Sequence, residues 1–323
     1  VIENGHIAEI NLGSNRLSGA IPASFSNLKQ LRKLGLYSSS NYYNRNNLST
    51  TNLENLSGIE NLEELDLSYC QLSGAIPNSW GQLTKLKSLV LSNNTLEGEL
   101  FSTIGNLTAL ETINLSQNSI TSIPPAIGNL TLLKTLDLSN NNTTSLPTTI
   151  GNLTDLETIN LSYNSFTSIP STIENLSNLK TLQLSYNNIT TLPKELEDLS
   201  SLTQVYASGN QITDVVPLLS TSIYLNLSSQ TLTMKEFTYT GDDVLLANLP
   251  PITRYDRSKN DFSATNSFYL RINGSNVATN LSMEPDGSIL IPKEYLTSLT
   301  PEKEVSLFQS SGTASGTLIS FTT

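Results

Sequence analysis

The sequence is poor in the residues that carry most enzyme chemistry. It contains one cysteine, Cys70, and one histidine, His6, among 323 residues. A single cysteine excludes an internal disulfide framework and an all-cysteine metal site. A single histidine leaves almost no material for histidine-based acid–base or triad chemistry. We therefore expect no catalytic residue, no metal site and no cofactor, and we expect that the protein is not an enzyme.

Basic residues and long apolar runs are also scarce. The chain has 17 Lys+Arg against 28 Asp+Glu, a formal net charge of −11. Nucleic-acid binding requires a basic face for the phosphates, so we expect no nucleic-acid partner. The chain contains no run of eighteen apolar residues, and we therefore expect no transmembrane segment in it.

The sequence does contain a regular internal repeat. The stretch LETINLSQNSITSIP, which begins at Leu110, returns 46 residues later as LETINLSYNSFTSIP at Leu156. Related copies begin at Leu133 and Leu179, which gives a step of 23 residues. Alignment on the pattern L-x-x-L-x-L-x-x-N-x-L extends the array to about ten copies over residues 1–232. This pattern is typical of a leucine-rich repeat.

The repeat predicts an α/β solenoid. In each L-x-L a short strand turns its leucines to one face, and stacked copies bury them behind a continuous parallel sheet. We expect a horseshoe with this sheet on its concave face and brief helical turns on the return side. The amide of the repeat asparagine is expected to point inward and to satisfy backbone groups of adjacent coils. This ladder comprises Asn15, Asn46, Cys70, Asn94, Asn118, Asn141, Asn164, Asn187 and Asn210, where Cys70 is a structural substitute.

Some outward columns of the sheet follow the repeat closely. One alternates in sign at every step and should neutralise itself across neighbouring strands: Arg32, Glu63, Lys87, Glu111, Lys134, Glu157 and Lys180. Serine columns are interpreted as outward consensus positions: Ser92, Ser116, Ser139, Ser162 and Ser185. The charge column is therefore a poor place for a charged ligand.

Two outward columns vary from coil to coil. The central column reads Asp66, Val90, Asn114, Asp137, Asn160, Gln183 and Tyr206. The column before the ladder reads Tyr69, Asn93, Gln117, Asn140, Tyr163 and Tyr186. The Gln117/Tyr163 difference between the two long copies therefore points to solvent, whereas Ile120/Phe166 is an inward apolar position. Tyrosine is enriched at binding hot spots, and we expect Tyr163, Tyr186 and Tyr206 to form an aromatic patch, although exposed tyrosines can also simply cover a sheet.

One coil is longer than its neighbours. Leu31 and Leu62 are 31 residues apart, seven more than the neighbouring step of 24. The extra residues should leave the coil just after the strand and place Tyr42, Tyr43 and Arg45 on the rim of the concave face. The candidate partner-binding residues are thus Tyr42, Tyr43, Asp66, Tyr69, Asp137, Tyr163, Tyr186 and Tyr206.

Residues 233–323 lose the leucine step and change character. FYLRI, GSILI, VSLFQ and GTLISFT alternate in polarity and are separated by N-G, P-D-G and S-G turn signals. Such short strands predict a small all-β, immunoglobulin-like sandwich.

The arrangement resembles bacterial extracellular leucine-rich-repeat proteins of the internalin-like kind, in which repeats run directly into an immunoglobulin-like domain. The resemblance implies a secreted or cell-surface adhesion protein that binds a host or neighbouring-cell surface protein through the concave face. The stretch LSGAIP at Leu17 and Leu72 is instead similar to plant-type repeats, so a plant-type receptor or inhibitor ectodomain is an alternative. A second alternative keeps the array as a scaffold and gives the ligand, a glycan for example, to the β domain.

Overall fold

The structure of the protein is a computed structural model, and it divides into two compact units. The first comprises Val1–Asn187 with Asp198–Leu202, and the second comprises Asn188–Glu197 with Thr203–Thr323. The described residues are 1–39, 42–212, 223–226, 244–246, 267–272, 275–281, 289–291, 304–311 and 314–322.

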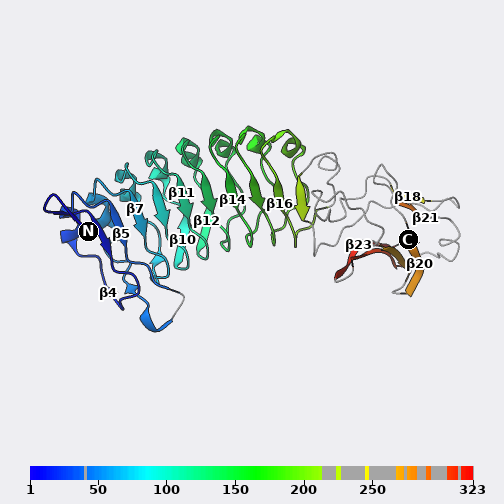
Figure 1. Ribbon diagram of the computed structural model, residues 1–323, viewed down its shortest axis with the longest axis horizontal. Helices are drawn as coiled ribbons and strands as arrows, with labels where there is room; N and C mark the ends of the chain where they lie inside the picture. Colours follow the sequence, from blue (N-terminus) through cyan, green and yellow to red (C-terminus); the bar gives the residue numbers. More distant parts are fainter. Residues whose placement is uncertain are drawn as a thin grey trace. The chain divides into compact units, whose positions relative to one another are not determined.

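The first unit is a stack of coils, each of which contributes one strand to a parallel sheet. Figure 1 shows the coils side by side, with the sheet strands following one another in chain order. The strands are β3 (Glu9–Asn11), β5 (Lys33–Gly35), β7 (Glu64–Asp66), β9 (Ser88–Val90), β11 (Thr112–Asn114), β13 (Thr135–Asp137), β14 (Thr158–Asn160) and β15 (Thr181–Gln183). Equivalent letters of the repeat lie opposite one another, as Thr112 does to Thr135, so the repeat step sets the register. The predicted solenoid with a parallel sheet is confirmed.

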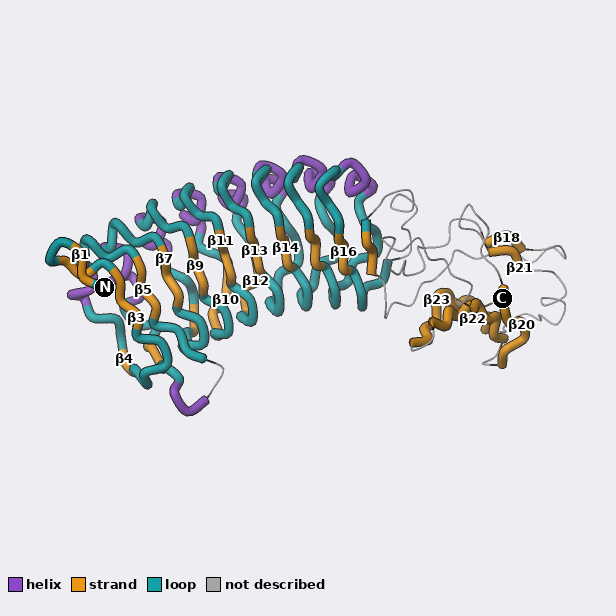
Figure 2. Tube along the Cα trace, viewed as in Figure 1, coloured by secondary structure: helices purple, strands orange, loops and turns teal. Residues whose placement is uncertain are grey.

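The return side of each coil forms a short 3-10 helix. These turns are η1 (Ala23–Asn27), η3 (Leu53–Gly58), η4 (Asn78–Gln82), η5 (Ser102–Asn106), η6 (Pro125–Asn129), η7 (Thr148–Asn152) and η8 (Ser171–Asn175). A further 3-10 helix, η2 (Tyr42–Asn44), lies in the extra residues of the long coil. Figure 2 shows η4 to η8 together along one edge of the unit, at the top of the view. Proline directly precedes several of them, as Pro147 precedes η7, and most of them end at asparagine, as η7 does at Asn152. The brief turns expected from the sequence are confirmed.

Glycine in these turns lets neighbouring coils approach closely. A Cβ on Gly128 would lie 2.6 Å from both the Cβ and the carbonyl oxygen of Thr149 in the next turn. Any larger residue would have to push the coils apart, which explains the repeated I-G-N at this place.

Smaller strand pairs complete the first unit. β1 (Ile2–Glu3) and β2 (His6–Ile7) form an antiparallel hairpin, and β4 (Ser18–Gly19) pairs in parallel with β6 (Asn47–Leu48). β10 (Thr95–Glu99) lies between β8 (Ser73–Gly74) and β12 (Ser119–Ser122) in a second parallel sheet.

The core lies between the parallel sheet and the 3-10 turns. Leu136 and Leu138 point inward from the strand side, and Ile127 and Leu130 meet them from the turn side, all fully buried. Ile120 and Phe166 are also fully buried, which confirms that the second difference between the two long copies is a size change in the core. Because each coil buries its apolar residues against its neighbours, no coil is stable alone.

The asparagine ladder connects the coils through buried amides. The Asn94 Oδ1 atom accepts hydrogen bonds from the N–H groups of Cys70 and Leu72, each at 3.0 Å. Its Nδ2 atom donates to the carbonyl of Leu67 in the preceding coil at 2.9 Å and to that of Leu91 in its own coil at 2.8 Å. One amide thus satisfies four backbone groups, as the sequence predicted.

The ends of the ladder differ from its middle. In the long coil Asn46 holds the ladder position, as predicted, and its Nδ2 donates to the carbonyls of Leu12 and Leu36. Asn15, in the first coil, is exposed and its Nδ2 donates to Gly13 O within the same coil, so the prediction of an inward amide is wrong at this position.

The second unit contains two types of strand pairing. β16 (Gln204–Tyr206) pairs in parallel with β17 (Tyr224–Asn226), and η9 (Lys194–Asp198) precedes them in the chain. Further on, β18 (Val244–Leu246) pairs antiparallel with β21 (Ile289–Ile291). The strands β20 (Ser275–Leu281), β19 (Ser267–Ile272), β22 (Glu304–Ser311) and β23 (Ala314–Thr322) form an antiparallel sheet in that order.

The strands predicted at FYLRI, SILI, VSLFQ and GTLISFT are therefore present as β19, β21, β22 and β23. The predicted turns between them lie outside the described residues. The immunoglobulin-like sandwich and the boundary at residue 232 stay predictions.

The ladder yields a first testable prediction. Replacement Asn141→Ala removes the donor to Leu115 O and Leu138 O and the acceptor for Ile120 N, all buried. Buried groups left without partners cost about 1–3 kcal/mol. The free energy of unfolding measured in urea should fall by this amount, which lowers the urea concentration at the midpoint. The matched control is Asn142→Ala, an exposed neighbour, which should change stability by less than about 0.5 kcal/mol. Equal effects of the two variants would contradict the ladder's role.

Candidate partner-binding site

A row of side chains lies just beyond the C-terminal ends of the sheet strands. Each coil contributes one of them, directly before its ladder residue. We call it the edge row. Its members share a left-handed backbone with φ between 54° and 59°: Tyr69, Asn93, Gln117, Asn140, Tyr163 and Tyr186. The sequence correctly placed this column outside the core, but it did not reveal the left-handed turn. The asparagines at 93 and 140 were the one available signal, because asparagine tolerates this conformation well.

The tyrosines of the edge row occupy an unfavourable backbone conformation. A left-handed residue with a Cβ costs about 1–2 kcal/mol relative to the right-handed form, and large side chains are unusual there. In the following coil the equivalent residue is Gly209, with φ 65°, which carries no such cost. The protein is therefore less stable with tyrosine at positions 69, 163 and 186 than it would be with asparagine or glycine there. Residues kept at such a cost cluster at functional sites.

Two of these tyrosines lie against each other. The ring centroids of Tyr163 and Tyr186 are 4.5 Å apart with an interplanar angle of 15°. Stacking contributes about 0.5–1.5 kcal/mol and fixes both rings. The two residues still remain 51% and 47% exposed. They form a rigid aromatic ridge on the first unit, while Tyr206, half-buried at the end of β16, belongs to the second unit and its place in one patch stays a prediction.

The far end of the edge row is covered by the long coil. The Arg45 guanidinium lies over the Tyr69 ring, 5.5 Å from its centroid, a cation–π geometry. The extra residues leave the coil between Ser38 and Asn46, where the Asn46 N–H donates to Ser38 Oγ at 2.7 Å and closes the loop. The predicted position of the insertion is confirmed.

Tyr43 is the exposed tyrosine of this loop. Tyr43 is 81% exposed, and its carbonyl accepts a hydrogen bond from Arg16 Nε at 3.1 Å, which holds the loop against the first coil. The side chain of Tyr42 lies outside the described residues. Exposure makes Tyr43 available for contact, and its role as a binding residue stays a prediction.

The aspartates of the central column take part in local turns. Asp66 Oδ1 accepts from the N–H and the Oγ–H of Ser68, at 2.9 and 2.7 Å, and Asp137 Oδ1 bonds in the same way to Ser139. Both aspartates are half-buried. Each aspartate therefore stabilises a local turn, a structural role that the sequence did not reveal.

The same turns correct the prediction of outward serines. Ser92, Ser139 and Ser162 are buried, each below a tenth exposed. The chain turns sharply at the left-handed residue that follows each of them, and the Ser139 hydroxyl donates to Asp137 Oδ1 instead of facing solvent.

The alternating charge column neutralises itself as predicted. Glu63 pairs with Lys87, Glu111 with Lys134 and Glu157 with Lys180, each at 2.7 Å. At the start of the column Arg32 departs from the prediction and pairs with Glu3 of the N-terminal hairpin, at 2.6 Å. Each lysine lowers the pKa of its glutamate, chiefly through the hydrogen bond it donates.

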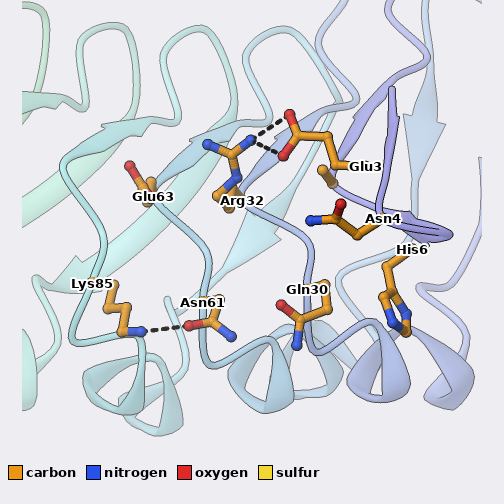
Figure 3. Close-up of a pocket in the computed structure, with 9 residues that line it drawn as sticks. Glu3, Asn4, His6, Gln30, Arg32, Asn61, Glu63 and Lys85 are labelled. Carbon is orange, nitrogen blue, oxygen red and sulfur yellow. Dashed lines mark hydrogen bonds and ion pairs between the residues drawn. The ribbon is translucent and has the colours of Figure 1, made fainter.

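A polar recess of about 290 Å³ lies at the N-terminal end of the first unit. It is lined by Glu3, Asn4, His6, Ala8, Gln30, Arg32, Asn61, Glu63 and Lys85. Figure 3 shows that Arg32 reaches Glu3 through two hydrogen bonds and that Lys85 reaches Asn61. Within the recess the charge of Arg32 is matched by Glu3, whereas Lys85 donates to the neutral amide of Asn61.

Cys70 fills its ladder position as an inert thiol. It is fully buried, and its Sγ donates to the carbonyl of Leu36 at 3.0 Å. Burial, together with the nearby charge of Asp66, raises the pKa of the thiol to about 12. Since the thiolate is the reactive species, this cysteine is a poor nucleophile.

Among the described residues, no group of three or more His, Cys, Asp or Glu side chains is placed to hold a metal ion. No helix in the described part of the chain is both long enough and apolar enough to cross a membrane.

Comparison with known families identifies the repeat. The leucine-rich repeat region profile matches residues 44–162, and two further leucine-rich repeat profiles match residues 154–212 and 6–28. No curated protein shows a significant sequence match to the chain.

Solved structures give the same result. The Leptospira interrogans LRR protein LIC12759 is 29% identical with a TM-score of 0.59, over 71% of this chain and 56% of that one. The ectodomain of the Arabidopsis thaliana receptor kinase GASSHO1/SCHENGEN3, in complex with CASPARIAN STRIP INTEGRITY FACTOR 2, is 27% identical (TM-score 0.57; 70% and 33% covered). The Arabidopsis receptor kinase HAESA, in complex with the peptide hormone IDA and the co-receptor SERK1, is 28% identical (TM-score 0.55; 72% and 44% covered). The chain spans about half the length of the first and less than half of the other two.

The parallel-sheet coils, the buried ladder and these matches together define the class. The chain is a leucine-rich-repeat protein, a solenoid scaffold of the protein-interaction type. Proteins of this type are typically non-enzymatic binding modules.

The environment of Cys70 yields a second prediction. With its pKa near 12 and its sulfur buried, Cys70 should not react with Ellman's reagent at about pH 8 in the folded protein. The same thiol should react fully after unfolding in guanidinium chloride, which is the control. Rapid reaction in the folded state would contradict the buried ladder position.

The charge column yields a prediction on pH. The pKa of Glu111 is lowered in the folded state by its hydrogen bond and charge interaction with Lys134. The pair therefore stabilises the fold at pH values above the pKa of an unfolded glutamate, about 4.3. This stabilisation is lost as the pH falls through the lower pKa of the folded state. Glu111→Gln should therefore lower the melting temperature slightly near neutral pH and leave it unchanged in strong acid. Melting curves across this range, with the exposed Glu174→Gln as control, test it. An effect that grows towards low pH would contradict the sign.

Proposed function

We propose that this protein is a non-enzymatic, extracellular or cell-surface module that binds a partner protein through the sheet face of its repeat array. The observation that carries the proposal is the pair Tyr163 and Tyr186 of the edge row, which are exposed and held in a backbone conformation that costs stability. A surface that merely covered a sheet would have no reason to retain tyrosine where asparagine or glycine fits better.

The chemistry of the ridge suits protein recognition. Tyrosine offers a large, amphipathic contact area with few rotatable bonds, and tyrosines are enriched at binding hot spots. The stack of Tyr163 on Tyr186 fixes both rings before any partner arrives. Little conformational entropy would then be lost on binding, which favours affinity.

The related structures support a protein ligand and an extracellular setting. Two of the plant ectodomains described above were solved with a bound peptide or protein ligand. We infer for this chain a partner on a host or neighbouring cell, with Tyr43 of the insertion and Tyr206 of the second unit as further candidate contacts. Asp66 and Asp137 retain one carboxylate oxygen each outside the serine turns and complete the set.

A binding screen tests the proposal. The full chain would be tested by surface plasmon resonance against a panel of purified ectodomains from host and bacterial surfaces. We expect specific binding that weakens by roughly 30-fold or more in the double variant Tyr163→Asn/Tyr186→Asn, as for hot-spot tyrosines. The melting temperature should hardly change, because asparagine relieves the backbone cost while the stack is lost.

The control separates the array from the β strands that follow it. A chain that ends at residue 232, checked by its melting curve, should retain binding, with Glu174→Gln as a surface substitution that leaves affinity unchanged. Absence of any ectodomain binding would contradict the proposal. Binding that survives the double tyrosine variant and disappears with residues 233–323 would favour the β region as the ligand site.

A further inference from the structure

The backbone of the edge row is already used by the fold. The N–H groups of Asn93, Gln117 and Asn140 donate to serine carbonyls of the next coil at 2.8–2.9 Å. The carbonyls of Gln117, Asn140 and Tyr163 accept from ladder N–H groups at 3.1–3.2 Å. A partner therefore cannot pair with this backbone as an added β-strand would, and side chains must provide the contacts.

These side chains share a neutral, two-way hydrogen-bonding chemistry. Asn93, Gln117 and Asn140 each present an amide that both donates and accepts, as a peptide group does. None of the edge row carries a charge at neutral pH, although the whole chain has a net charge of −11. The charge column, before the strands, consists of ion pairs that neutralise each other, and the central column lies between it and the edge row. A charged partner segment would gain no counter-ion from the row itself, and the nearest carboxylates, Asp66 and Asp137 of the central column, already accept hydrogen bonds from serines.

The row has the length of a short peptide segment. Adjacent strands are about 4.8 Å apart, so the row from Tyr69 to Tyr186 extends over roughly 24 Å. An extended chain covers about 3.4 Å per residue, which corresponds to about seven residues. At one end Arg45 covers the Tyr69 ring, and at the other the Tyr163–Tyr186 ridge is open.

We propose that the edge row recognises an uncharged, extended segment of the partner protein. Main-chain amides of the segment bond to the side chains of Asn93, Gln117 and Asn140, and an apolar or aromatic residue packs on the Tyr163–Tyr186 ridge. This inference rests on the proposed function and adds to it the chemistry and the length of the recognised element. It also assigns binding roles to the amide residues at 93, 117 and 140.

A peptide library provides the probe. Random twelve-residue peptides displayed on phage would be selected on the immobilised full chain, and the enriched peptides would be synthesised and measured by calorimetry. We expect sequences without net charge that contain an aromatic or apolar anchor. Their affinity should change little between about 50 mM and 500 mM salt, because no ion pairs form.

Variants that keep the left-handed backbone locate the site. Gln117→Gly and Asn140→Gly retain the permitted φ and remove only the amide, and each should weaken peptide binding by about tenfold. Tyr163→Asn/Tyr186→Asn should weaken it more strongly. Glu111→Gln, in the charge column before the same strand, is the matched control and should leave affinity unchanged.

Several results would overturn the inference. These are a selection that enriches no peptide, enriched peptides that are charged and lose affinity in salt, or affinity that is indifferent to the edge-row variants. Binding of a neutral oligosaccharide array in place of peptides would also overturn it. If an ectodomain from the earlier screen binds the array and ignores the glycine variants, the segment model falls while the proposed protein-binding function stands.

Discussion

The structure of the array depends on one interaction, the inward amide of the ladder. Each ladder asparagine bonds to backbone groups of its own coil and of the coil before it, as Asn94 does to Leu91 and Leu67. The coils have little regular secondary structure, since their strands are short and their helices are single 3-10 turns. Backbone groups that would otherwise be buried without partners are satisfied by these amides. Leucine burial supplies the driving force, and the ladder makes that burial compatible with an irregular chain.

The ladder also generates the surface that we assign to binding. In the coils from Tyr69 to Tyr186 a left-handed residue stands directly before the ladder residue. The sharp turn at this residue directs the next amide inward and its own side chain outward. One geometric requirement of the core thus produces a regular outward row whose backbone is rigid and whose side chains can vary. Substitutions in this row can therefore change the surface without disturbing the packed interior.

Charge is arranged so that this row stays neutral. The ionised side chains of the sheet face lie mainly in a column of lysine–glutamate pairs, where neighbouring coils compensate each other. Such exposed pairs add little stability. With these charges paired, the uncharged side chains of the edge row, at the other end of the strands, are suited to select partners through shape and hydrogen bonding more than through electrostatic attraction.

The sequence by itself determined the repeat step, the parallel sheet, the inward asparagines, the buried Phe166 and the position of the long coil's insertion. These features follow from local periodicity, which can be read directly from the pattern of residues. It also located the strands at β19, β21, β22 and β23 from alternating polarity. The left-handed backbone of Tyr163, the burial of Ser139 and the pairing of Arg32 with Glu3 were decided only by the tertiary structure. Each of these depends on the neighbouring coil, since a turn, a burial or an ion pair between residues distant in sequence arises only when coils are stacked.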